Sequence, residues 1–171
     1  MSLARLPSQR LAGHAWASRG FTLVELLVVI AIMAVLATIA TPLADLSKRR
    51  AQEEELRRSL REIRGALDQY KRLADAGHIE KATGEAGYPP SLKLLEAGVT
   101  DPMSPQGTRI YILRSLPRDP FAPADAADAA DTWATRSYAS PPDDPQPGAD
   151  VFDVHSKSSA IGLNGIAYRS W

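Results

Sequence analysis

The sequence predicts an α+β fold in which a long N-terminal helix packs on a small antiparallel β-sheet. The first observation is an apolar run at residues 21–41 that continues into an amphipathic stretch at residues 42–76, with apolar residues at helical spacing. The second is that 11 of the 13 prolines lie from Pro89 onward, where no long helical period survives. Short strand-like segments lie between these prolines. A helix followed by strands is the order typical of an α+β domain.

Residues 21–41 predict a membrane-spanning helix. These 21 residues would form about 31 Å of helix, which matches the hydrocarbon core of a bilayer. Glu25 is the one ionisable residue in the run. Because a carboxylate inside a membrane costs about 2.5–3.5 kcal/mol on insertion scales, its presence indicates a function. A secretory signal peptide would have a shorter apolar core and a small-residue cleavage site, and a plain signal anchor would give no reason for Glu25.

Residues 42–76 predict an amphipathic continuation of the same helix. Its apolar face, expected to pack on a globular domain, carries Leu56, Leu60, Ile63, Leu67, Tyr70 and Ala74. Its charged face carries Glu53, Glu54, Arg57, Arg58, Arg61, Glu62 and Arg64. Favourable four-residue spacing separates Glu54 from Arg58 and Glu53 from Arg57. This face is expected to be solvated, with contact between subunits as the alternative. Pro42 lacks an amide hydrogen and is expected to kink the helix near the bilayer exit. Gly77 fits a C-terminal cap.

Residues 77–171 predict a globular domain of short elements. A short helix is expected at residues 91–96. Strands are expected at residues 109–113, 132–139 and 150–155, with a weaker one at residues 166–171. Proline-rich loops separate these strands, so the sheet is expected to be small and antiparallel.

Charge and composition exclude several classes of protein. Residues 1–20 hold three arginines and no acid, which favours a cytoplasmic N-terminus. The rest of the chain holds 17 basic and 20 acidic residues, so its charge gives no reason to expect a nucleic-acid partner. The chain has no cysteine, which excludes disulfides and thiolate metal sites.

The sequence gives no indication of an enzyme. His14 precedes the apolar run, while His78 and His155 stand alone without metal-ligand spacing. The sequence contains no glycine-rich phosphate loop, nucleophile elbow or paired-histidine zinc motif. The large aromatic residues of the C-terminal half are interpreted as core or contact residues: Trp133, Phe152 and Trp171.

The stretch Arg-Gly-Phe-Thr-Leu-Val-Glu at residues 19–25 resembles the prepilin cleavage and methylation site of the type IV pilin and pseudopilin superfamily. In that family a prepilin peptidase cuts after the glycine and N-methylates the new terminal residue. The resemblance implies that residues 1–20 are a cleaved leader, that the cut falls between Gly20 and Phe21, and that Phe21 is methylated. It also implies that Glu25 acts in filament assembly, and Pro42 matches the family's helix-kinking proline.

Three later motifs resemble the protein G family of the type II secretion system (general secretion pathway): Tyr-Pro-Pro-Ser-Leu at 88–92, Leu-Pro-Arg-Asp-Pro-Phe at 116–121 and Asp-Val-Phe-Asp at 150–153. This resemblance implies a non-enzymatic pseudopilin that polymerises into an inner-membrane-anchored filament driving protein secretion, with its C-terminal domain in the periplasm. The implied partners are the prepilin peptidase, other pseudopilin subunits, the secretion-system inner-membrane platform and the membrane. A minor type IV pilin, a competence pseudopilin, and a membrane-tethered binding module or enzyme are the alternatives.

In typical members of that family, the loop after the proline-aspartate-proline motif binds calcium. Here Ser-Lys-Ser-Ser at residues 156–159 stands where the family supplies loop carboxylates, and a lysine is a poor neighbour for a hard cation. A weak calcium site at Asp150 and Asp153 is the alternative to no cofactor, with Asp143 and Asp144 as further oxygen donors. We expect instead that the loop is held by local hydrogen bonds and by packing of Phe152, Tyr168 and Trp171.

Overall fold

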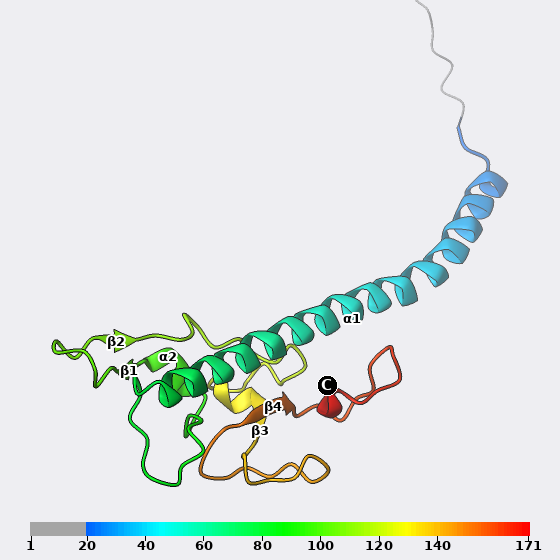
Figure 1. Ribbon diagram of the computed structural model, residues 1–171. Coiled ribbons are helices and arrows are strands. Elements are labelled where there is room, and N and C mark those ends of the chain that lie inside the picture. Colours follow the sequence, from blue (N-terminus) through cyan, green and yellow to red (C-terminus); the bar gives the residue numbers. More distant parts are fainter. Residues whose placement is uncertain (1–19) are drawn as a thin grey trace, which may run out of the picture. The chain divides into compact units, whose positions relative to one another are not determined.

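The computed structural model describes residues 20–171, except the side chains of residues 39–42. The chain divides into two compact units, one that ends at Leu43 and one that runs from Ala44 to Trp171. Helix α1 (Leu23–Asp75) begins in the first unit and ends in the second (Figure 1). Residues 1–19, interpreted above as most of a leader, lie outside the described residues.

Both ends of α1 have side-chain or backbone caps that the sequence supports. At the start, Thr22 Oγ1 accepts a hydrogen bond from the Glu25 amide at 3.2 Å, which satisfies one of the free N–H groups of the first turn. At the end, Gly77 has a φ of 84°, and the His78 amide donates to the Leu73 carbonyl at 2.9 Å. This is the left-handed cap expected at Gly77. The predicted helix is therefore confirmed to within two residues.

The apolar face predicted for the second half of α1 forms the core of the second unit. All six residues of that face are buried: Leu56, Leu60, Ile63, Leu67, Tyr70 and Ala74. They pack with residues from the short elements and loops, among them Leu95, Leu116, Trp133, Val151, Val154 and Tyr168. The helix thus supplies one continuous side of the core, and the remainder of the chain covers it.

The other elements of the second unit are short. In chain order they are α2 (Lys93–Ala97), β1 (Val99–Thr100), β2 (Arg109–Ile110), the 3-10 turn η1 (Ala130–Thr132), β3 (Trp133–Arg136), β4 (Asp153–Ser156) and the 3-10 turn η2 (Tyr168–Ser170). Strands β1 and β2 form one antiparallel ribbon, and β3 and β4 form another, with Trp133 opposite Ser156 and Arg136 opposite Asp153.

The α+β prediction is confirmed. The strands expected at residues 109–113, 132–139 and 150–155 are shorter, as β2, β3 and β4, and three further details of the sheet differ from expectation. The expected single sheet is two separate two-stranded ribbons among the described residues. The weak strand expected at residues 166–171 is wrong, because this segment turns into η2 so that the Tyr168 side chain is fully buried beside α1. Strand β1 was not expected, since two residues carry no alternation that a sequence pattern could reveal.

Candidate functional site

The junction between Gly20 and the start of α1 is the first candidate site. Gly20 and Phe21 are exposed and precede the helix, and Glu25 lies in its first turn. A Cβ atom built on Gly20 would meet no heavy atom within 4 Å, so packing in the described structure does not require glycine there. The capping role of Thr22 was not predicted, although the Thr-x-x-Glu spacing of residues 22–25 is the signature of such a cap.

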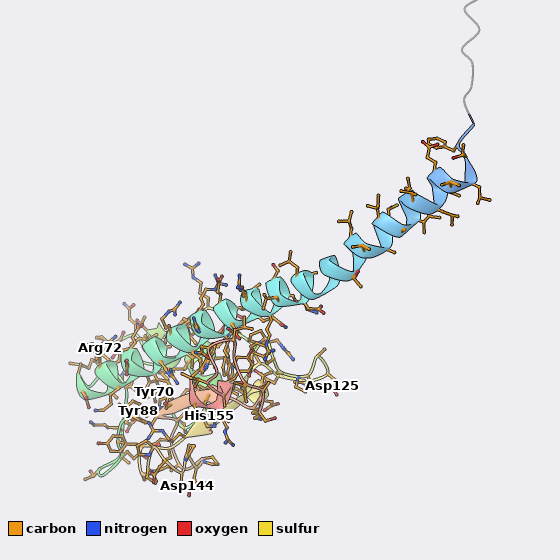
Figure 2. All side chains as sticks on the ribbon, turned by 90° about the vertical axis from the view of Figure 1, so that its right-hand side faces the viewer. Tyr70, Arg72, Tyr88, Asp125, Asp144 and His155 are labelled. Atoms are coloured by element: carbon orange, nitrogen blue, oxygen red, sulfur yellow. The ribbon has the colours of Figure 1, made fainter. Side chains whose placement is uncertain are left out.

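In the described part of the first unit, residues 20–38 and Leu43, the helix buries none of its apolar side chains. Large apolar residues from Leu23 to Leu36 are about half or more exposed and project from all sides of the helix (Figure 2). This segment is the one described helix that is long and apolar enough to cross a membrane. A helix that is apolar all round and unpacked matches a lipid environment, in which such side chains are not exposed to water. The described segment therefore fits the predicted membrane span.

Helix α1 runs through Pro42, and the Pro42 side chain lies outside the described residues. The predicted kink at this position stays a prediction.

In the second unit, the charged face of α1 binds the C-terminal loop. The Glu53 carboxylate accepts hydrogen bonds from the Tyr168 hydroxyl at 2.9 Å and from the Leu163 amide at 2.7 Å. The Arg49 guanidinium donates to the Tyr168 hydroxyl and to the Ile161 carbonyl. Burial raises the pKa of Tyr168, and its bond to Glu53 also raises it, whereas Arg49 acts in the opposite direction. We call these five residues the clasp.

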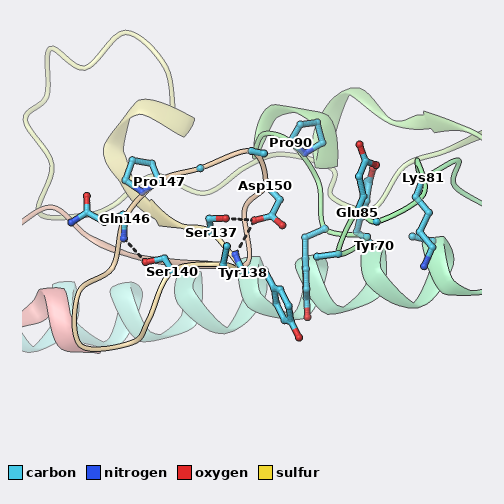
Figure 3. A pocket seen from close by; sticks show the side chains of 18 of the residues that line it. Tyr70, Lys81, Glu85, Pro90, Ser137, Tyr138, Ser140, Gln146, Pro147 and Asp150 are labelled. Atoms are coloured by element: carbon cyan, nitrogen blue, oxygen red, sulfur yellow. Dashed lines mark hydrogen bonds between the residues drawn. The ribbon is translucent and has the colours of Figure 1, made fainter.

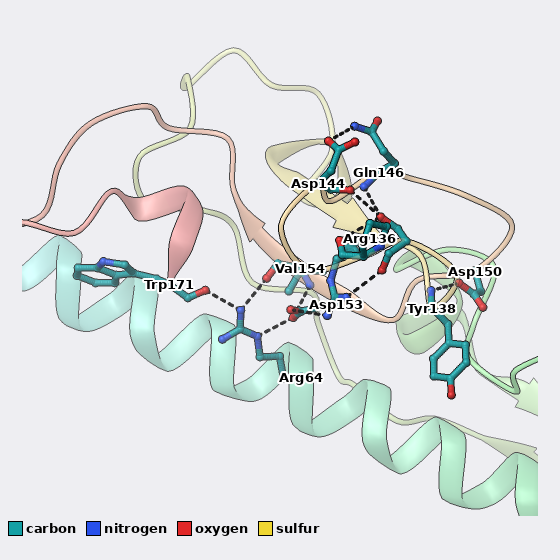
Figure 4. Close-up of polar contacts among 11 residues, drawn as sticks. Arg64, Arg136, Tyr138, Asp144, Gln146, Asp150, Asp153, Val154 and Trp171 are labelled. Atoms are coloured by element: carbon teal, nitrogen blue, oxygen red, sulfur yellow. Dashed lines mark hydrogen bonds and ion pairs between the residues drawn. The ribbon is translucent and has the colours of Figure 1, made fainter.

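Arg64 holds a second part of the C-terminal segment against α1 (Figure 4). Its guanidinium donates to Asp153 Oδ1 at 2.8 Å, to the Val154 carbonyl at 3.0 Å and to the Trp171 carbonyl at 2.7 Å. The Arg57 guanidinium lies 4.4 Å from the centre of a Trp171 ring, within the range of a cation–π contact. The helix face that holds the segment is therefore the same one that carries the clasp.

These contacts correct part of the prediction of a solvated charged face. Its exposed members are as expected: Glu54, Arg57, Arg58, Arg61 and Glu62. Glu53 and Arg64 differ. Glu53 is buried, and Arg64 is half-buried and bonded to residues about 90 to 107 positions later in the chain. The expected Glu53–Arg57 pair is wrong, because Glu53 binds Tyr168 and Leu163 while Arg57 lies over Trp171. The physical reason is that the C-terminal loop presents donors and a ring at this face, and a sequence pattern within one helix contains no information about them.

The two candidate calcium ligands are engaged in separate contacts. Asp150 Oδ1 accepts from the Ser137 hydroxyl at 2.7 Å and from the Tyr138 amide at 2.8 Å (Figure 3). Asp153 pairs with Arg64, and Arg136 lies 3.7 Å from its other oxygen. No cluster of three or more histidine or acidic residues suited to a metal occurs between residues 20 and 171.

The stretch at residues 156–159 is likewise bonded to protein groups. The Ser156 hydroxyl donates to Asp119 Oδ2 at 2.5 Å, and Lys157 Nζ donates to the Asp131 carbonyl at 2.6 Å. A calcium ion prefers six to eight oxygen ligands, and an ammonium group beside it would repel it. The residues present therefore do not fit a calcium cage, and the absence of a bound cofactor stays a prediction.

The expected packing of Phe152, Tyr168 and Trp171 is found in two separate clusters. The rings of Tyr168 and Trp171 meet edge to face at 5.0 Å. Phe152 instead packs edge to face with Tyr88 at 5.0 Å and with Tyr138 at 5.4 Å. Tyr88 and Tyr138 also line a groove of about 790 Å³, together with Tyr70, Pro90 and Asp150 (Figure 3).

The described histidines and Trp133 lie in the second unit. His78 Nδ1 lies 3.0 Å from Asp101 Oδ2, just beyond the cap of α1. His155 lies on β4, where burial lowers its pKa; Asp153 opposes this shift, and Arg64 and Arg136 add to it. Trp133 is buried in the core, and its ring nitrogen donates to the Pro117 carbonyl at 2.8 Å. His78 and Trp133 therefore have structural partners, and His155 is partly buried on β4.

The exposed glycine junction, the capped apolar helix and its first-turn glutamate together define the class of proteins with a long apolar helix near the N-terminus. The family model described as "Prokaryotic N-terminal methylation motif" matches residues 17–41. This match covers the junction and the apolar part of α1.

Two known proteins extend the similarity into the second unit. The chain is 32% identical over 109 residues to "Type II secretion system core protein G" of Klebsiella michiganensis, which covers 61% of this chain and 69% of that protein. It is 34% identical over 107 residues to the protein of the same name from Klebsiella pneumoniae, with 60% and 69% covered. No solved structure matches. The chain therefore belongs to the type II secretion system core protein G family.

Proposed function

We propose that this chain is a non-enzymatic pseudopilin subunit of a type II secretion system. Prepilin peptidase removes residues 1–20 and N-methylates Phe21, and the mature subunits then polymerise into a filament anchored in the inner membrane. The N-terminus faces the cytoplasm and residues 77–171 lie in the periplasm, where the filament and the inner-membrane platform drive secretion. The observation that carries the proposal is the exposed Gly20–Phe21 junction directly before a capped apolar helix with Glu25 in its first turn.

Electrostatics explains why such a helix needs Glu25. Cleavage would leave an ammonium group on Phe21, two residues before the N-terminal end of α1. The helix dipole is positive at this end, so the new ammonium is unfavourable there and a nearby carboxylate is favourable. When subunits are staggered along a filament, the Glu25 of one subunit can pair with the Phe21 ammonium of its neighbour. Removing one partner of such a buried pair costs about 3–5 kcal/mol, so the pair would set the register between subunits.

The test is assembly of Glu25→Val and Glu25→Gln variants. Both should insert into the membrane at least as well as the wild type, because each removes a charged side chain whose insertion costs about 2.5–3.5 kcal/mol. Both should lose most of the cross-linked multimers, because the ammonium of the neighbouring subunit has no counter-charge. The matched control is Glu54→Gln, which removes an exposed acid from the second unit and should leave assembly unchanged. Normal multimers in both Glu25 variants would contradict the proposed pairing.

A further inference from the structure

The groove of about 790 Å³ in the second unit carries a net negative charge (Figure 3). Residues 80–90 and 137–150 supply most of its lining. Of the charged side chains in that lining, one is basic and four are acidic; the acids are Glu80, Glu85, Asp144 and Asp150. The base, Lys81, already pairs with Asp75 at 2.9 Å. We call this site the acidic groove, and its charge favours a cationic occupant.

Tyr138 gives the acidic groove an open aromatic surface. Its ring packs against Tyr88, with centroids 5.9 Å apart, and against Phe152, yet the residue is 60% exposed. Next to it in the lining, Asp150 uses Oδ1 for its bonds to the Ser137 hydroxyl and the Tyr138 amide, which leaves Oδ2 for another donor. Arginine stacks on aromatic rings and pairs with carboxylates through one planar group, so it fits this surface better than lysine.

An extended basic segment lies elsewhere on the same unit. The sequence from residue 102 to residue 118 holds three arginines and no acid. Arg109 and Arg114 are exposed, and Tyr111 between them is 62% exposed. The segment has a defined shape, because the amides of residues 112 and 113 both donate to the Leu95 carbonyl. The Tyr111 ring also packs closely over Gly98, where a Cβ atom would lie 2.9 Å from it.

The acids beside this segment already have partners. Asp101 lies 3.0 Å from His78, and the buried Asp119 accepts from the Ser156 hydroxyl. Glu96 is exposed and accepts from the amide of residue 116 at 3.3 Å. Because Asp101 and Asp119 are mostly buried, the exposed charge between residues 109 and 114 is basic.

We propose that residues 109–114 of one copy dock in the acidic groove of a second copy. Arg109 and Arg114 pair with the carboxylates of the groove, and Tyr111 packs on Tyr138. The occupant is a second copy because the chain itself carries the complementary charge and aromatic ring. None of residues 102–118 lines the groove, so the two surfaces are distinct and the contact is head-to-tail. Such a contact leaves one surface free at each end and can therefore repeat along a filament.

This inference rests on the proposed polymerisation and adds a contact of the second unit to the Glu25 pairing. A contact of one short segment is smaller than a standard protein–protein interface, so it would be weak between free copies. Subunits that are already joined through their apolar helices meet at a high effective concentration, which makes a weak second contact sufficient.

The absence of cysteine from the chain allows cross-linking between single-cysteine copies. One full-length copy carries Ser115→Cys, and a second copy with a different tag carries Ala139→Cys, an exposed residue of the groove lining. Both are expressed with the prepilin peptidase and treated in membranes with a short bis-maleimide. The matched control for Ala139→Cys is Ala160→Cys, because Ala160 is exposed and lies outside the groove. An amine cross-linker applied to the same membranes measures multimers independently.

Docking predicts a yield of cross-links from position 115 to position 139 that is several-fold higher than the yield from 115 to 160, or from 115 to 115. Glu80→Lys with Glu85→Lys in the copy that supplies the groove should lower this yield several-fold. Arg109→Glu with Arg114→Glu in the other copy should then restore it, which shows that the variants fold. A yield that the charge reversals leave unchanged would overturn the proposal.

The other outcomes separate docking from polymerisation. Equal yields from position 115 to positions 139 and 160, with multimers still present, would overturn docking and leave polymerisation intact. A lack of multimers would overturn both. Cross-links from 115 to 115 as strong as those from 115 to 139 would indicate a two-fold contact and overturn the head-to-tail arrangement. Protection of Ala139→Cys from maleimide without a cross-link to position 115 would assign the groove to another partner.

Discussion

The clasp predicts a large energetic coupling between Glu53 and Tyr168. Glu53→Ala leaves the buried Tyr168 hydroxyl without its acceptor, and an unsatisfied buried polar group costs about 1–3 kcal/mol. The Leu163 amide also loses its acceptor, but Leu163 is partly exposed, so water can replace that bond at a smaller cost. We therefore expect Glu53→Ala to lower the free energy of unfolding of residues 44–171 by about 2–4 kcal/mol. For a unit of this size, each kcal/mol of lost stability lowers Tm by roughly 3–5 °C.

A double-mutant cycle isolates the contact. Tyr168→Phe alone leaves the buried Glu53 carboxylate with one donor fewer, and a bond to a charged group contributes about 1.5–3 kcal/mol. In the double variant both partners are gone, so the two losses should overlap, with a coupling energy of about 1.5–3 kcal/mol. Urea denaturation followed by tryptophan fluorescence provides the values. Glu54→Ala, which removes the neighbouring exposed acid, should change stability by less than about 0.5 kcal/mol. A coupling energy indistinguishable from zero would refute the clasp.

Two further predictions concern pH and calcium. Burial lowers the pKa of His155, so its contribution to stability is present above the unfolded value of about 6.5 and is lost as pH falls below it. The urea midpoint of the wild type should therefore fall between about pH 7 and pH 5.5 more steeply than that of His155→Phe, and equal slopes would refute this. Calcium at a hundredfold excess over its Kd would stabilise the domain by about 2.7 kcal/mol. We expect no such rise, because Asp150 and Asp153 already bind protein groups; a rise that Asp153→Ala abolishes would contradict us.

Local patterns in the sequence predict the helix and its core well. The spacing from Leu56 to Ala74 repeats with the helical period, and a helix face with this period has to be buried against something. Gly77 was identified as a cap because a left-handed residue favours glycine, and its φ of 84° confirms it. The Gly20–Phe21–Glu25 motif also depends only on residues that are neighbours in the chain.

Contacts between distant segments could not be predicted in the same way. Glu53 and Arg64 look like solvated helix residues, and their partners lie on the C-terminal segment about 90 to 115 residues away. Tyr168 was assigned to a weak strand because aromatic residues favour strands, but its hydroxyl binds Glu53 and the chain turns at that point. Strand pairing and loop docking are set by such long-range contacts, for which one sequence offers no periodic signal.

The most direct test of the central claim is the mass of the mature N-terminus. The chain is expressed with its prepilin peptidase, purified from membranes and analysed by mass spectrometry, beside the same chain from cells that lack the peptidase. We predict that the wild type begins at a methylated Phe21 only when the peptidase is present, and that Gly20→Leu keeps residues 1–20 in both cells. A wild-type chain that retains residues 1–20 in peptidase-competent cells, or one cut after the apolar run, would contradict the assignment as a pseudopilin subunit.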